Sequence, residues 1–187
     1  MNKPTPYTWE QYQTEHQVEA LWYRLCVEAA AVAAWESGGR PINGLAFNVH
    51  SLYGTFFLSY NVAEEGETGV TLQAQGYYPP DWSDEINPAV YAVFEQGWEA
   101  QHRLAIEAIM YGLGDEITGD EQAFDDFSRG FLTSCRRVMV RLQDDGVWAQ
   151  ALNLTGDCWY QVTEIDADQD EEERLLEEVR AQMHGGG

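Results

Sequence analysis

The stretch LAFNVHSLYGTFFLSYNV, residues 45–62, decides the fold class. Leu45, Phe47 and Val49 alternate with less apolar neighbours, and after a turn apolar residues again fall at every second position. An alternation of period two is typical of strands that bury one face. A third such run, Val70–Ala74, follows a Glu-rich loop. We therefore expect an antiparallel meander of three strands.

Helical periodicity flanks this meander on both sides. Thr8 and Gln11 have the spacing of a capping box, and Asn87 with Pro88 has the pattern of a second helix start. Residues 147 to 165 contain two further apolar runs separated by Thr155-Gly156-Asp157, which indicates a hairpin. We expect helices over about 8–36, 88–112, 121–143 and 168–183, and a final hairpin of Val147–Leu154 with Cys158–Ile165.

This order of elements predicts an α+β fold. The expected sheet is antiparallel and has about five strands, the meander plus the C-terminal hairpin, with helices packed on it. The seven tryptophans are spread along the chain, as suits one continuous core. We predict a single domain over residues 1–184 and a frayed tail over residues 185–187.

The charge of the chain is one-sided. Asp and Glu number 32 against 10 Lys and Arg, which gives a formal net charge of -22 on 187 residues. Such a chain lacks the clustered cations that bind a phosphate backbone, so we do not expect nucleic acid as a partner. It attracts basic surfaces instead. Aromatic residues make up 13% of the chain, so it is expected to fold, unlike acidic disordered chains.

The three cysteines, Cys26, Cys135 and Cys158, lie far apart and inside apolar patterns. They are expected to be buried free thiols in a reducing compartment. No stretch approaches the length and hydropathy of a membrane span, and the first residues have no apolar signal-like region. We therefore expect a cytoplasmic protein without a membrane partner.

Two features give the candidate binding residues. Three acidic pairs follow one another between residues 115 and 126, and the segment around residue 82 places a tryptophan beside acidic side chains. An exposed tryptophan there is a plausible anchor for a partner, although one that plugs the edge of the sheet fits equally well. The candidate partner-binding residues are Asp81, Trp82, Asp115, Glu116, Asp120, Glu121, Asp125 and Asp126.

Patterns that resemble metal or catalytic sites are incomplete. The run Asp166-x-Asp168-x-Asp170 has Glu171 where a calcium loop needs glycine, and its acids suit the start of a helix. Glu99-x-x-His102 is one half of a di-iron motif without the other half, and an ion pair with Arg103 explains it better. We predict no metal site and no cofactor.

The remaining reactive residue types have structural interpretations. Cys135 lies mid-helix in register with Phe131, which favours core packing over nucleophilic chemistry. The cluster Arg136, Arg137 and Arg141 is expected to pair with carboxylates that are near in sequence rather than to hold an anion; these carboxylates are Asp125, Asp126, Asp144 and Asp145. The sequence therefore identifies no catalytic residue.

Several short segments resemble an uncharacterised bacterial domain-of-unknown-function family that is often met near toxin–immunity gene clusters. The resemblance extends over most of the chain, and it implies an α+β fold and immunity-type binding without implying catalytic residues. The segments that carry it are residues 29–35 (AAAVAAW), Phe56–Val62 followed by Ala63-Glu64-Glu65, Tyr78–Trp82, and the closing strand that leads into Asp166-Ala167-Asp168.

Charge and resemblance favour a non-catalytic cytoplasmic protein that binds a basic protein partner, such as a toxin that it neutralises. Two alternatives stay open. One is a hydrolase with a carboxylate-based site, because acidic pairs are abundant and sequence spacing does not show which of them converge. The other is a regulatory module that binds a small ligand beside Trp82. The oligomeric state is not readable from the sequence.

Overall fold

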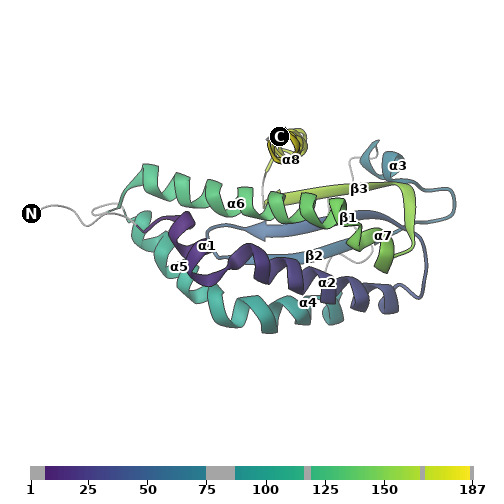
Figure 1. The fold of residues 1–187 in the computed structure, drawn as a ribbon, viewed down its shortest axis with the longest axis horizontal. Helices are drawn as coiled ribbons and strands as arrows, with labels where there is room; N and C mark the ends of the chain where they lie inside the picture. The colour runs from purple at the N-terminus through teal and green to yellow at the C-terminus, as the bar shows by residue number, and fades with distance from the viewer. Residues whose placement is uncertain (1–6, 75–86, 116–118, 165–166, 186–187) are drawn as a thin grey trace, which may run out of the picture.

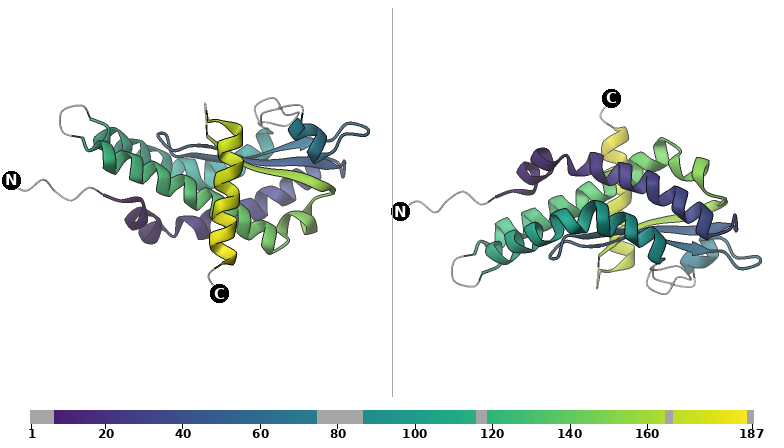
Figure 2. Two further views of the ribbon diagram at one scale, coloured as in Figure 1. Left: turned by 90° about the horizontal axis from the view of Figure 1, so that it is seen from above. Right: turned by 90° about the horizontal axis from the view of Figure 1, so that it is seen from below.

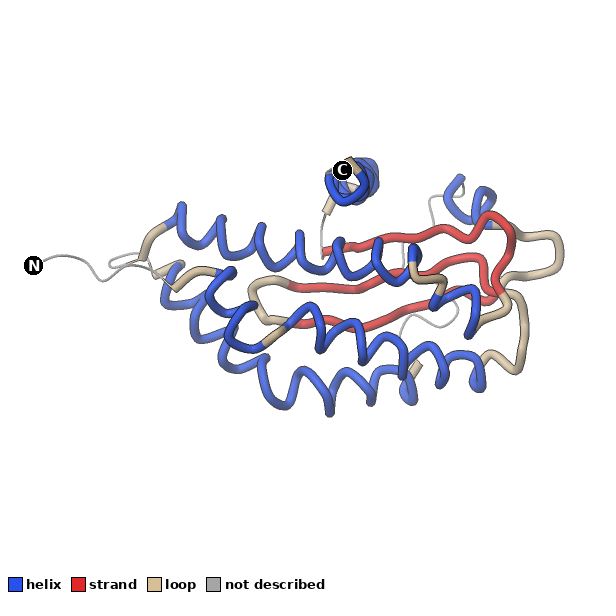
Figure 3. The backbone as a smooth tube through the Cα atoms, viewed as in Figure 1, coloured by secondary structure: helices blue, strands red, loops and turns tan. Residues whose placement is uncertain are grey.

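The computed structural model describes residues 7–74, 87–115, 119–164 and 167–185. Within these ranges the sheet has three strands, β1 (Ile42–His50), β2 (Thr55–Val62) and β3 (Leu154–Glu164). Their order is β2-β1-β3 (Figures 1 and 3). The neighbouring strands β1 and β2 form an antiparallel hairpin, whereas β3 runs parallel to β1. The sheet is therefore mixed.

Helices account for most of the remaining described chain, and the α+β class is confirmed. The predicted segments 88–112, 121–143 and 168–183 are all helical, with ends within one or two residues of the expected ones. The helices are α1 (Trp9–His16), α2 (Val18–Glu36), α3 (Gly69–Ala74), α4 (Pro88–Phe94), the π-helical turn η2 (Glu95–Glu99), α5 (Ala100–Leu113), α6 (Glu121–Asp144), α7 (Val147–Ala151) and α8 (Gln169–His184).

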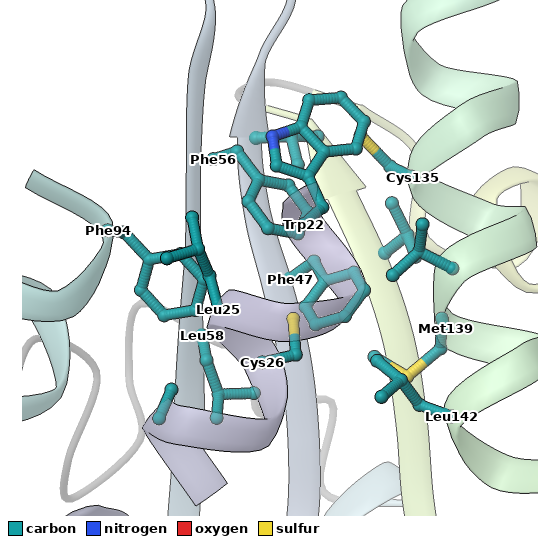
Figure 4. Packing of buried hydrophobic residues seen from close by; sticks show 14 of the residues in the cluster. Trp22, Leu25, Cys26, Phe47, Phe56, Leu58, Phe94, Cys135, Met139 and Leu142 are labelled. Carbon is teal, nitrogen blue, oxygen red and sulfur yellow. The ribbon is translucent and has the colours of Figure 1, made fainter. Parts of the chain in front are cut away.

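The long helices cover one face of the sheet and enclose the core (Figure 1). Leu45, Phe47 and Val49 point from β1 into this core, as their alternation predicts. Trp22 of α2 packs there beside Phe56 of β2 (Figure 4). Helix α8 crosses α6 at a steep angle outside this layer, and α3 lies at the opposite end of the sheet from the α5–α6 connection (Figures 1 and 2).

The prediction of a third meander strand at Val70–Ala74 is wrong, because this segment forms α3. The Asp157 carboxylate of β3 accepts a hydrogen bond from the Val70 backbone N–H at 3.1 Å. Gly69 lies so close to β3 that a Cβ atom would be 1.8 Å from the Asp157 carbonyl oxygen. Leu72 is then buried with Trp159. Contacts with a distant strand, rather than the local alternation, decide the conformation.

The predicted C-terminal hairpin is also wrong. Val147–Ala151 forms α7, which follows Gly146 in the left-handed region at φ 68°. Trp148 and Leu152 are both buried, and their separation of four residues is a helical spacing. Only the second half of the hairpin is a strand, as part of β3, and it pairs with β1. The sheet consequently lacks the five antiparallel strands that the sequence suggested within the part of the chain that the structure describes.

Two helix details refine the predicted boundaries. The capping box between Thr8 and Gln11 is present, but the first helix is broken at Gln17, which has φ 51°. The Asn87 side chain caps α4 as expected, accepting from the backbone of Ala89 and Val90. The predicted helix 88–112 is interrupted between α4 and α5 by the π-helical turn η2, which the periodicity of the sequence did not indicate.

The three cysteines are free thiols, as predicted, but Cys158 is only half-buried. Cys26 and Cys135 are buried in the core, and burial raises the pKa of both thiols well above the ordinary value. Burial also raises the pKa of Cys158, to about 12. All three are therefore protonated at neutral pH and are poor nucleophiles. Across the described ranges, every helix is too short or too polar to cross a bilayer.

Replacing glycine by alanine at two helical positions should change the stability in opposite directions. A Cβ at Gly130 would lie 2.8 Å from Trp9, whereas a Cβ at Gly112 meets no atom within 4 Å. Gly112→Ala should stabilise the protein by about 0.5–1 kcal/mol, because alanine loses less backbone entropy in a helix. Gly130→Ala should instead destabilise it by about 1–3 kcal/mol through overpacking. Urea unfolding of both variants measures this, and a stabilising Gly130→Ala would contradict the packing of α1 on α6.

Candidate functional site

The predicted acidic residues lie mostly at the tip of the hairpin formed by α5 and α6. Asp81, Trp82 and Glu116 fall outside the described residues. Asp115 follows the end of α5, and the other four acids occupy the first turns of α6 or its cap. This tip lies at the end of the molecule farthest from α3 (Figure 1).

Three of the predicted acids surround one hollow. Asp115, Glu121 and Asp125 line a hollow of about 520 Å³, together with the apolar side chains of Leu113 and Phe124. Glu121 and Asp125 are four residues apart, so they lie on the same face of α6. The hairpin thus combines a carboxylate rim with an apolar wall, which we call the hairpin hollow.

The other two described acids stabilise the helix locally. The Asp120 side chain accepts from the Ala123 backbone N–H at 3.1 Å and so caps α6. Asp126 accepts a hydrogen bond at 2.9 Å from Gln122, and its carboxylate is also 2.9 Å from the guanidinium of Arg129. The structure therefore separates Asp120 and Asp126 from the acids of the hairpin hollow.

The side chains of Glu121 and Asp125 are not paired with any other described residue. Both side chains are exposed, and neither has a hydrogen bond or an ion pair among the described residues. Arg129, the first basic residue along α6, pairs with Asp126 and not with Glu121 or Asp125. An exposed, unpaired carboxylate contributes to the negative potential at the surface and is ready to pair with a cation from outside.

A second hollow adjoins the first at Asp125. It is a groove of about 510 Å³ between α6 and α8, and Asp125 lines both hollows. The apolar side chains of Leu132, Leu175 and Val179 contribute to its walls. We call it the α6–α8 groove.

The α6–α8 groove was not predicted from the sequence. The sequence predicted a charged helix over 168–183 with acids at its start, and only the docking of α8 on α6 makes a groove there. Its exposed acids, Glu171 and Glu178, both contact Arg174 on the same helix. The predicted acids thus lie at the hairpin tip, whereas the residues of α8 that line this groove were not among the predicted ones.

A buried ion pair fixes α8 in place. The Arg136 guanidinium of α6 and the Glu172 carboxylate of α8 are 2.5 Å apart, and both side chains are almost completely buried. Burial is the main influence on Glu172 and raises its pKa, although Arg136 opposes this. Nearby, the Ser51 hydroxyl lies 2.7 Å from the Ser128 hydroxyl and donates to Glu164.

The three arginines of the α6 cluster all pair with carboxylates, but only Arg141 pairs with one of the predicted neighbours in sequence. Arg141 pairs with nearby Asp145 at 3.7 Å, but Arg137 reaches Glu19 of α2 at 3.6 Å. Arg136 likewise finds its partner on another helix. The cluster holds helices together rather than presenting free cations to an anion.

His102 belongs to an aromatic cluster between α1 and α5. Its Nδ1 atom is 2.9 Å from the Tyr12 hydroxyl, and its ring stacks on Trp98 with ring centroids 4.5 Å apart. Burial, followed by the nearby His16, lowers the pKa of His102, so the imidazole is neutral at pH 7. Within the described ranges no group of three His, Cys, Asp or Glu side chains is placed to hold a metal ion.

Glu99 departs from the expected surface ion pair. It contacts Arg103 at 3.6 Å, as the spacing predicts, but its side chain is buried and accepts a hydrogen bond from the Tyr91 hydroxyl at 2.9 Å. Burial is the main influence on Tyr91 and raises its pKa to about 12, so Tyr91 remains a donor at neutral pH. These contacts join α4 to α5 across the η2 turn.

Comparisons with protein-family models, curated proteins and solved structures found no match to this chain. The resemblance to an immunity-associated family therefore stays an expectation from the sequence.

Proposed function

We propose that this chain is a non-catalytic binding protein whose partner is a basic protein. The observation that carries the proposal is the unpaired state of Glu121 and Asp125 at the rim of the hairpin hollow, on a chain with a formal net charge of -22. Neutralising a basic toxin is the form of binding that the sequence resemblance favours. Cytoplasmic binding is part of the same proposal.

Electrostatics explains why such a surface would suit this task. Complementary charge raises the association rate by orders of magnitude at low salt, and the effect weakens as ions screen charges beyond about 8 Å. The apolar side chains of Leu113 and Phe124 then offer contacts that do not depend on salt. The hairpin hollow thus combines charges that speed association with apolar side chains that a bound partner can contact.

Three carboxylates that are paired within the fold support binding over hydrolysis. Glu172 is neutralised by Arg136, Glu99 accepts from Tyr91, and Glu164 accepts from Ser51. A general acid or base needs a carboxyl group within reach of substrate. In these three cases the carboxyl group instead connects one element of the fold to another.

The test begins with pull-downs against the products of neighbouring genes, followed by association kinetics across a salt series. Glu121→Gln/Asp125→Asn should slow association at low salt by about tenfold and change dissociation less, because rim charges act mainly on encounter. The difference should shrink as salt increases.

The matched control is Glu64→Gln/Glu65→Gln. It removes the same two charges from exposed positions in the β2–α3 connection, which lies at the other end of the molecule from the hairpin tip (Figure 1). Its association rate should stay close to that of the wild type. Equal slowing by both pairs would show that only net charge matters, and an acidic or salt-insensitive partner would overturn the proposal.

A further inference from the structure

The face of α6 that carries the unpaired acids continues into the α6–α8 groove. Glu121, Asp125, Ser128 and Leu132 follow one another at intervals of three or four residues, so they lie on one side of the helix. At 1.5 Å per residue, Glu121 and Leu132 are about 16 Å apart along the helix axis. One continuous surface therefore changes from acidic to apolar along its length.

The apolar end of this surface is open to a ligand side chain. Leu132 and Leu175 are only half-buried, and with Val179 they line a groove of about 510 Å³. Half-buried leucines facing a hollow gain free energy when another apolar side chain fills it, about 25 cal/mol for each Å² of apolar surface removed from water.

The cations around the groove are already paired. Arg129 pairs with Asp126, Arg136 with Glu172, and Arg174 with Glu171 and Glu178. The arginines that line or border the groove thus add little net positive charge to it. An anionic ligand would find no unpaired cation among these residues, whereas a basic segment would find Asp125 at the junction of the two hollows.

We infer that the partner contributes a bipartite segment, with Lys or Arg residues over Glu121 and Asp125 and a large apolar side chain in the α6–α8 groove. The inference rests on the proposed function and adds the chemistry of the partner. The two parts of the segment are separated by about 16 Å, which corresponds to about five residues of extended chain or about eleven of helix.

Two synthetic peptides test the inference. The first has arginines in one half and leucines in the other, and the second replaces the leucines by serines. Fluorescence anisotropy at low salt should show that the protein binds the arginine–leucine peptide about tenfold more tightly than the arginine–serine peptide. Burial of one leucine side chain is enough for such a ratio.

Two groove variants should remove this preference. Leu175→Ala takes away one wall, and Gln182→Trp fills the groove from an exposed position of α8 without removing any packing. Both should lower the preference to about twofold or less and keep the salt-sensitive binding of both peptides. Thermal unfolding checks that α8 stays docked in both variants. If Leu175→Ala weakens the docking of α8, the peptide preference is judged from Gln182→Trp alone.

The outcomes separate the two proposals. If both peptides bind with equal affinity and in a salt-sensitive manner, the groove inference is wrong and binding to a basic partner stands. If neither peptide binds at low salt, or Glu121→Gln/Asp125→Asn leaves binding unchanged, the acidic surface itself is not the site and both proposals fail. A preference that persists in Gln182→Trp also overturns the groove inference.

Discussion

Replacing Arg136 by methionine should destabilise the protein by about 3–5 kcal/mol. The substitution leaves the Glu172 carboxylate without its counterion at a position that is 4% exposed. A buried charge without a partner costs this much because neither water nor another group replaces the lost interaction. Urea unfolding followed by circular dichroism measures the change, and α8 is the element that should detach first.

The double variant Arg136→Met/Glu172→Leu is the matched control. Removing both charges together eliminates the desolvation cost, so most of the lost stability should return. The pH dependence gives a second check. Since burial raises the pKa of Glu172 above its ordinary value of 4.5, the folded protein binds this proton more tightly than the unfolded chain does.

The Arg136→Met variant should therefore recover stability relative to the wild type as the pH falls from 7 toward the ordinary pKa of glutamate. Loss of the nearby guanidinium raises the pKa of Glu172 further, and protonation then removes the unpaired charge. A destabilisation below about 1 kcal/mol, or a double variant as unstable as the single one, would show that this ion pair does not hold α8.

The long amphipathic helices were predictable from the sequence because their periodicity extends over many residues. Phe131 and Val138 of α6 are buried, in agreement with the predicted helical face. Short segments were not predictable in the same way. Leu72 and Trp148 belong to runs of five to eight residues in which alternation and helical spacing are hard to distinguish. Contacts with β3 and with the core decide these conformations.

The candidate site was likewise predictable only where its residues are close in sequence. The described members of the acidic run 115–126 are close in sequence and also lie close in space at the hairpin tip. The difference between Asp125, which is unpaired, and Asp126, which binds Arg129, depends on the direction in which each side chain leaves the helix. The α6–α8 groove depends on contacts such as Arg136 with Glu172, 36 residues apart, which no local pattern specifies.

Trp22→Ala should cost about 3–5 kcal/mol, the range for truncating a large buried aromatic side chain. The Trp22 ring is fully buried and stacks on Phe56 at a centroid distance of 4.4 Å (Figure 4). It also meets Trp98 at 4.9 Å and Phe131 at 5.2 Å in edge-to-face contacts. One substitution therefore leaves a cavity between α2, β2, η2 and α6, and such a site has little freedom to collapse.

Trp35→Ala is the control for this substitution, because it removes the same side chain from the same helix at a position that is 83% exposed. Its effect on the free energy of unfolding should stay within about 0.5 kcal/mol. Far-UV circular dichroism is the appropriate measurement, since both substitutions alter the fluorescence signal. The two variants should differ in their loss of unfolding free energy by about 3 kcal/mol or more, because one side chain is buried and the other is exposed. Similar losses would contradict the placement of Trp22 at the centre of the core.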